Sequence, residues 1–223
     1  MPPQHLLIYY AWPTCLPVEE FARYQHVVLG DGLQDPAHPS RPEPIIKACP
    51  QTAFYGYVDV GVSTQNLSPQ EIANRCRLWK QTGVRGVLLD DFGYDFGVTR
   101  ARQSAAVRSA HEAGLRVIAN AWNPADVFAP VSVLGENDLY LLESFQLQTR
   151  ERAARMRAFR CRNVLSIVTG DFSQQTYDEA YTWAVHEGHL ACGWGEPSYS
   201  SQNGLAPFRE RKVCLDLARS LPT

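Results

Sequence analysis

Residues 84–91 read VRGVLLDD, an apolar run that ends in two adjacent carboxylates. An apolar run without polar alternation is typical of a strand that is covered on both faces, as in a parallel sheet. A helix pattern precedes this run, with Ser68 at the cap, Pro69 at the first helical position and Glu71 three residues after the cap. Gly83 stands where that helix should end. The stretch therefore predicts a helix followed by a buried parallel strand.

The same unit recurs along the chain. Apolar stripes at helical spacing contain Ala106, Ala110 and Ala113 in one case and Val213, Leu217 and Leu221 in another, and a third runs over residues 177–184. Runs rich in β-branched and aromatic residues predict eight strands, at residues 6–10, 27–29, 54–60, 84–89, 116–119, 139–142, 164–168 and 190–194.

Strands that alternate with helices predict a parallel α/β fold. We expect a single-domain (β/α)₈ TIM barrel over residues 1–223, although such barrels more typically need ~250 residues. A doubly wound sheet is the alternative. The sequence has no G-x-G-x-x-G opening a helix and no Walker lysine, which are the usual marks of nucleotide-binding members of that class.

Composition narrows the class of protein. The net charge of −2 predicts no attraction to nucleic acid or to an anionic membrane, and no apolar run approaches the ~20 residues of a membrane helix. The six cysteines include no C-x-x-C pair, so we expect free thiols. The first residues carry no basic region, which favours a cytoplasmic protein, or an exported one if a signal segment was removed. The oligomeric state is left open.

Acidic residues gather where the predicted strands end, which is the working face of a parallel barrel. Aromatic and amide side chains follow the same strands. The acids are Asp31, Asp59, Asp90, Asp91, Glu143, Asp171 and Glu196, and the other side chains are Tyr9, Asn120, Trp122 and Trp194.

Carboxylates beside aromatic rings are the groups that a sugar-cleaving site needs, since hydrolysis takes one protonated acid and one ionised carboxylate. Glu143 follows the more apolar strand, so we predict a raised pKa and the role of general acid for it. Asp90 or Asp91 would be the nucleophile or base. The remaining predicted residues would bind the sugar: Tyr9, Asp31, Asp59, Asn120, Trp122, Asp171, Trp194 and Glu196. This reading needs no cofactor and no metal, and its partner is an oligo- or polysaccharide.

Two other readings compete with hydrolysis. Asp90, Asp91 and Asp95 could hold Mg²⁺ or Ca²⁺ in a metal-dependent hydrolase or lyase, because hard cations take oxygen ligands. A carbohydrate-binding barrel without catalysis would keep the tryptophans but not the acid pair. The arginines of residues 150–162 spread around a helix axis, so we expect a solvated helix there rather than a nucleic-acid site.

Residues 54–61, FYGYVDVG, and residues 86–92, GVLLDDF, are similar to the paired signature of the spherulin-4 and endo-α-1,4-polygalactosaminidase group of glycosidase-like barrels. Asn120 and Glu143 resemble the ends of that group's fifth and sixth strands. The resemblance implies a TIM barrel that acts on a galactosaminidic or related polysaccharide, with Asp90 and Glu143 as the acid pair. Asp91 stands where spherulin-like members have a second acid. Val62 and Ser63 follow Gly61 where the polygalactosaminidases have a glutamate.

Overall fold

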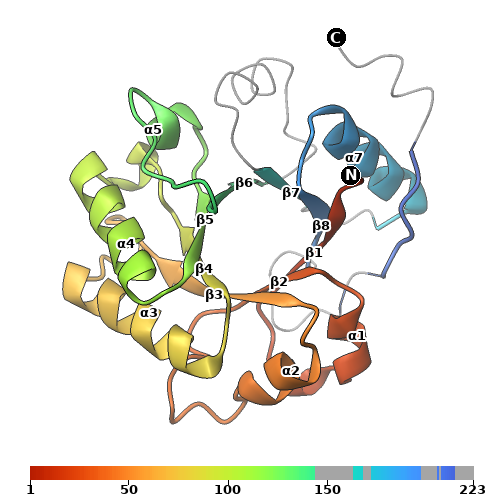
Figure 1. Cartoon of the computed structure of the whole chain (residues 1–223), viewed down its shortest axis with the longest axis horizontal. Helices are drawn as coiled ribbons and strands as arrows, with labels where there is room; N and C mark the ends of the chain where they lie inside the picture. The colour runs from red at the N-terminus through yellow and green to blue at the C-terminus, as the bar shows by residue number, and fades with distance from the viewer. Residues whose placement is uncertain (144–162, 168–171, 197–204, 206, 214–223) are drawn as a thin grey trace.

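A parallel sheet forms the centre of the molecule. The computed structural model describes residues 1–143, 163–167, 172–196, 205 and 207–213 (Figure 1). Each strand pairs in parallel with the next, and β8 pairs with β1, so the sheet closes on itself. The strands are β1 (Gln4–Tyr9), β2 (His26–Leu29), β3 (Ala53–Asp59), β4 (Gly86–Asp90), β5 (Arg116–Asn120), β6 (Leu139–Leu142), β7 (Asn163–Ile167) and β8 (Ala191–Gly195).

Helices lie outside the sheet (Figure 1). The three longer ones begin as their sequences indicate, because Ser68, Thr99 and Ser173 each accept a bond from a backbone N–H of the first turn. No helix among the described residues is long and apolar enough to cross a membrane. The α-helices are α1 (Val18–Ala22), α2 (Glu43–Ala48), α3 (Pro69–Thr82), α4 (Arg100–Glu112), α5 (Ala125–Phe128) and α7 (Gln174–His186), with short 3₁₀ turns at Pro13–Cys15 and Tyr94–Phe96.

The predicted α/β class with a parallel sheet is confirmed. The residues that follow β6 and β8 fall largely outside the described ones, so the complete eightfold repeat of strand and helix stays a prediction. Val213 belongs to no helix in its described segment, while Leu217, Leu221 and residues 150–162 lie outside the described residues. Cys15, Cys49, Cys76 and Cys192 are free thiols.

Alternate residues of each strand face opposite sides of the sheet, and this divides the apolar residues into two clusters. Val87 and Val117 belong to the outer cluster, between the sheet and the helices. The inner cluster fills the ring of strands with Leu6, Ile8, Val28, Tyr55, Leu88, Ile118, Leu139, Leu141 and others. This alternation also decides which polar side chains enter the mouth of the ring.

The contact between α3 and β3 depends on a glycine. A Cβ at Gly56 would lie 2.0 Å from Cδ2 of Trp79, so only glycine leaves room for the indole. Trp79 is fully buried, and its Nε1 donates to the backbone oxygen of Tyr57 at 2.9 Å. This close packing fixes the part of β3 that ends at Asp59.

Gly56→Ala should therefore destabilise the protein. Overpacking a buried contact typically costs about 1–3 kcal/mol of unfolding free energy. Displacing the indole of Trp79 would also disturb its hydrogen bond to the backbone oxygen of Tyr57. Urea denaturation measures the change. Gly135→Ala is the matched control, because a Cβ there would meet its nearest atom at 3.5 Å, an ordinary contact. Equal stabilities of the two variants would contradict the packing argument.

Candidate active site

Four polar side chains continue the inner face of the sheet at the carboxyl ends of neighbouring strands. Asp90 stands two residues after Leu88, and Asn120 stands two residues after Ile118, both members of the inner cluster. Glu143 follows Leu141 at the same spacing, and Asp59 follows Tyr55 at twice that spacing. Because alternate residues of a strand share a face, these side chains point into the mouth of the ring.

Asn120 joins two of the carboxylates. Its Nδ2 donates to Oδ1 of Asp90 at 2.7 Å and to Oε2 of Glu143 at 2.9 Å. The two acceptor oxygens therefore lie no farther apart than the sum of these bonds, 5.6 Å. Strands β4, β5 and β6 are neighbours in the sheet, so three distant segments of the chain deliver one connected group.

The Asp90 carboxyl holds its proton unusually well. Burial, and next the negative charges of Asp91 and Glu143, raise its pKa to about 7, although hydrogen bonds from Tyr57 and Asn120 act in the opposite direction. We predicted on sequence grounds that the raised pKa would belong to the acid after the more apolar strand, Glu143. The structure instead gives a physical reason for a raised pKa at Asp90, because this carboxyl is buried and lies close to the charges of Asp91 and Glu143.

Tyr57 is a site residue that the sequence analysis did not single out. Its ring lies on the inner face, in edge-to-face contact with Tyr10 at a centroid distance of 5.5 Å. Burial and the neighbouring Asp90 raise the pKa of its hydroxyl, which keeps it a proton donor toward that carboxyl. Its position two residues before Asp59 on β3 was the available signal, since it shares a face with that acid.

Asp91 leaves the strand direction. Its φ of 51° is in the left-handed region, which aspartate tolerates better than most residues. Its carboxyl lies beside Asp59 and Thr64, and burial followed by the charge of Asp59 raises its pKa. Thr64 also donates to Oδ1 of Asp59 at 2.7 Å. Asp59 and Asp91 thus form a second carboxyl pair next to the first.

A cavity of about 130 Å³ opens onto this group. Trp122 forms an aromatic wall of this cavity and is 52% exposed. The cavity is lined by Asp91, Asp95, Phe96, Asn120, Ala121, Trp122 and Glu143. The structure thus brings together five of the predicted site residues, Asp90, Asp91, Asn120, Trp122 and Glu143, with Asp59 beside them.

Three predicted sugar-binding residues lie apart from the polar group at the mouth, and the structure gives no support to that role for them. Trp194 is 1% exposed and packs against Phe172 and Tyr177 behind β8. Tyr9 is 2% exposed in the outer cluster. Asp31 forms an ion pair with Arg75 at 2.8 Å.

Glu196 is buried after β8. Burial raises its pKa to about 7, and the backbone N–H of Ala11 opposes that rise. Glu196 stands two residues after Trp194 and therefore faces the same outer side of the sheet. The structure thus gives no support to the prediction that Glu196 binds sugar. Asp171 lies outside the described residues.

The metal alternative lacks a geometric basis. Asp90 points to Asn120, and Asp91 turns toward Asp59, so these side chains do not converge with Asp95 on one point. Among the described residues, no three histidine, cysteine or acidic side chains are grouped so that they could hold an ion.

Neither a family model nor a curated protein matches the sequence, but solved structures match the fold. The glycoside hydrolase domain of PelA from Pseudomonas aeruginosa is similar with a TM-score of 0.59 and 13% identity, over 91% of this chain and 98% of that one. Oxaloacetate acetylhydrolase has a TM-score of 0.55 and 15% identity, over 87% and 75%. D-psicose 3-epimerase has a TM-score of 0.52 and 10% identity, over 87% and 84%. These likenesses establish an α/β barrel-like fold that different enzymes share.

The raised pKa of Asp90 predicts a pH-dependent stability. Because the folded pKa of about 7 exceeds the unfolded value of 3.8, the folded state binds more protons between these pH values, and stability falls as pH rises through them. Asp90→Asn should therefore gain stability relative to the parent between pH 4 and pH 8, by up to about 4 kcal/mol. Urea denaturation at both pH values measures this difference.

Asp35→Asn is the control, because Asp35 is exposed and asparagine keeps the oxygen that bonds to the Ala37 N–H. Its stability should follow that of the parent at both pH values. A pH-independent difference between Asp90→Asn and the parent would show that Asp90 ionises as an ordinary surface acid.

Proposed function

We propose that the protein hydrolyses an O-glycosidic bond with Asp90 and Glu143 as its two carboxyl groups. The observation that carries this proposal is the shared amide of Asn120, which holds the two carboxyl groups together at the mouth of the sheet. Glycosidases need one carboxyl group protonated and the other ionised at the same pH. Mutual charge and burial favour that state here, since the Asp90 pKa of about 7 exceeds that of an ordinary acid.

The spacing supports a retaining reaction. Retaining glycosidases have carboxyl groups ~5–5.5 Å apart and inverting ones ~6.5–9.5 Å apart. The bound of 5.6 Å between one oxygen of each carboxyl group leaves no room for a water molecule on that line. Asp90 would donate its proton to the leaving oxygen while Glu143 attacks the anomeric carbon. Water would then release the sugar from Glu143, with its proton returning to Asp90.

This assignment exchanges the two roles expected from the sequence. The change rests on the burial of Asp90 and on the position of Glu143 in the cavity wall, where it can reach a bound ring. Trp122 would pack against the apolar face of that ring. Asn120 would position the carboxyl groups rather than bind sugar, because both amide hydrogens are already donated.

The substrate class rests on the resemblance to the polygalactosaminidase group alone, while the fold likeness to the PelA glycoside hydrolase domain agrees with glycosidase chemistry. We therefore propose an amino-sugar polysaccharide, of galactosaminidic type. A carbohydrate-binding barrel without catalysis is the alternative, and the exposed ring of Trp122 would serve it equally well. The two differ in whether the carboxyl pair does chemistry.

Asp90→Asn and Glu143→Gln should each lower the hydrolysis of partly deacetylated galactosaminan oligosaccharides by about 10²–10⁴-fold, the usual contribution of an acid–base group. Reducing-end release measures the rate. Glu19→Gln is the control, since Glu19 is exposed on α1 and should not affect the rate. Parental rates in both site variants would overturn the assignment, and binding without cleavage by the parent would favour the carbohydrate-binding alternative.

A further inference from the structure

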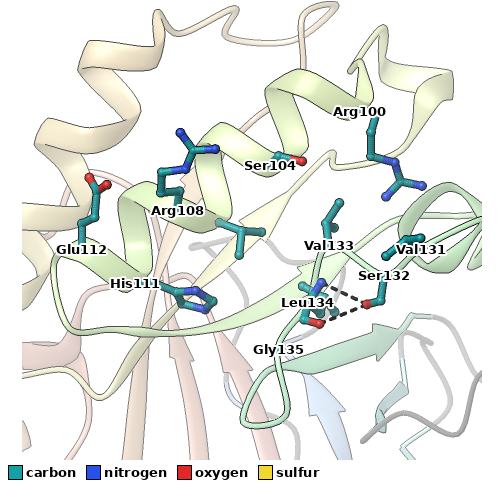
Figure 2. Close-up of a pocket in the computed structure, with 11 residues that line it drawn as sticks. Arg100, Ser104, Arg108, His111, Glu112, Val131, Ser132, Val133, Leu134 and Gly135 are labelled. Carbon is teal, nitrogen blue, oxygen red and sulfur yellow. Dashed lines mark hydrogen bonds between the residues drawn. The ribbon is translucent and has the colours of Figure 1, made fainter.

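A second and larger cavity lies on the outside of the barrel. It measures about 780 Å³ and runs between α4 and the segment of residues 131–135 that leads to β6 (Figure 2). None of its lining residues belongs to the candidate active site. We call it the α4 groove; it is lined by Arg100, Ser104, Val107, Arg108, His111, Glu112, Val131, Ser132, Val133, Leu134 and Gly135.

The two walls of the α4 groove differ in chemistry. Arg100, Ser104 and Arg108 are spaced by four residues on α4, so they form one stripe along the helix. Figure 2 shows this stripe across from Val131 and Val133. The opposite wall carries no charge, and Val131 in it is 75% exposed. A molecule in the groove would therefore meet cations on one side and aliphatic groups on the other.

Contacts within the chain hold both walls of the α4 groove in place. Arg100 donates to the backbone oxygens of Val127 and Ala129, which ties α4 to the start of the opposite segment. At the other end, Nε2 of His111 lies 2.9 Å from Oδ2 of Asp138, which also accepts from the Gly135 N–H. A preformed groove loses less conformational freedom when it binds a ligand.

Positive charge exceeds negative charge along this surface. Arg108 forms no ion pair within the described part of the chain, and Glu112 is the only acid in the lining of the α4 groove. A neighbouring cavity of about 430 Å³ shares His111 and Gly135 with it. That cavity adds Arg85 and Arg116, with the acids Glu136 and Asp138.

The lining also distinguishes a peptide from a sugar. Apart from the His111 imidazole, no aromatic ring of the described residues lines the α4 groove, so it lacks the broad tryptophan or tyrosine faces on which sugar rings pack. Aliphatic and cationic walls suit acidic and aliphatic side chains that alternate, because an extended peptide points successive side chains to opposite sides. We propose that the α4 groove binds an extended acidic peptide segment of a partner protein, with its carboxylates on Arg108 and its aliphatic side chains on Val131 and Val133.

A fluorescein-labelled peptide of four Glu-Val repeats tests this proposal by fluorescence anisotropy. We expect saturable binding that weakens as salt rises, since exposed charges are screened. Arg108→Ala should weaken binding by about tenfold, the effect of an interface arginine that carries much of the affinity. Val131→Ser should also weaken it, because the serine offers less apolar surface. A Lys-Val repeat peptide should not bind, and a Glu-Ser repeat should bind more weakly.

Arg77→Ala is the matched control, since Arg77 is an exposed arginine on α3 that does not line the groove. Its affinity should equal that of the parent. The proposal is overturned if the Glu-Val peptide does not bind, if Arg77→Ala weakens binding as much as Arg108→Ala, or if labelled oligogalacturonate binds at Arg108 more tightly than the peptide. Concentration-dependent self-association that Val131→Ser abolishes would also overturn it, by identifying a second copy of this chain as the occupant.

Discussion

The amide of Asn120 is the contact on which the candidate active site depends. It donates one hydrogen to Asp90 and the other to Glu143, and so sets the spacing of two groups that would otherwise repel each other. The strands that carry these side chains fix their relative positions. Asp90, Asn120 and Glu143 come from three adjacent strands whose register is fixed by parallel pairing, and each continues the inner face of its strand. A one-residue change of phase in any of them would turn its side chain to the outside.

The alternation of inward-facing and outward-facing residues along each strand also explains how far the site could be predicted from the sequence. The apolar runs located all eight strands, and the acids at the ends of β4 and β6, which the sequence predicted as a pair, lie close together. The direction of the side chains was harder to predict. A strand that is buried on both faces is apolar at every position, so it shows no alternation from which to tell inside from outside. The sequence therefore did not show that Trp194 and Tyr9 face the outer cluster, nor that Tyr57 faces the inner one.

Asp31 and Asp90 illustrate a second limit of prediction from the sequence. Asp31 is paired with Arg75, which lies far from it in the sequence, and no local pattern predicts that contact. The pKa of a carboxyl depends on every charge that surrounds it in space, and Asp90 is close to both Asp91 and Glu143. An argument from the polarity of one strand therefore selected Glu143, whereas the three-dimensional surroundings favour Asp90 as the group that keeps its proton.

A carbon-13 NMR titration of the aspartate and glutamate carboxyl groups tests the central claim most directly, because it reads the proton without needing a substrate. The account predicts that Asp90 titrates at about 7 and that Glu143→Gln lowers this pKa, since the charge of Glu143 helps to raise it. A titration of Asp90 near 4, unchanged by Glu143→Gln, would contradict the account by showing that the two carboxyl groups act independently.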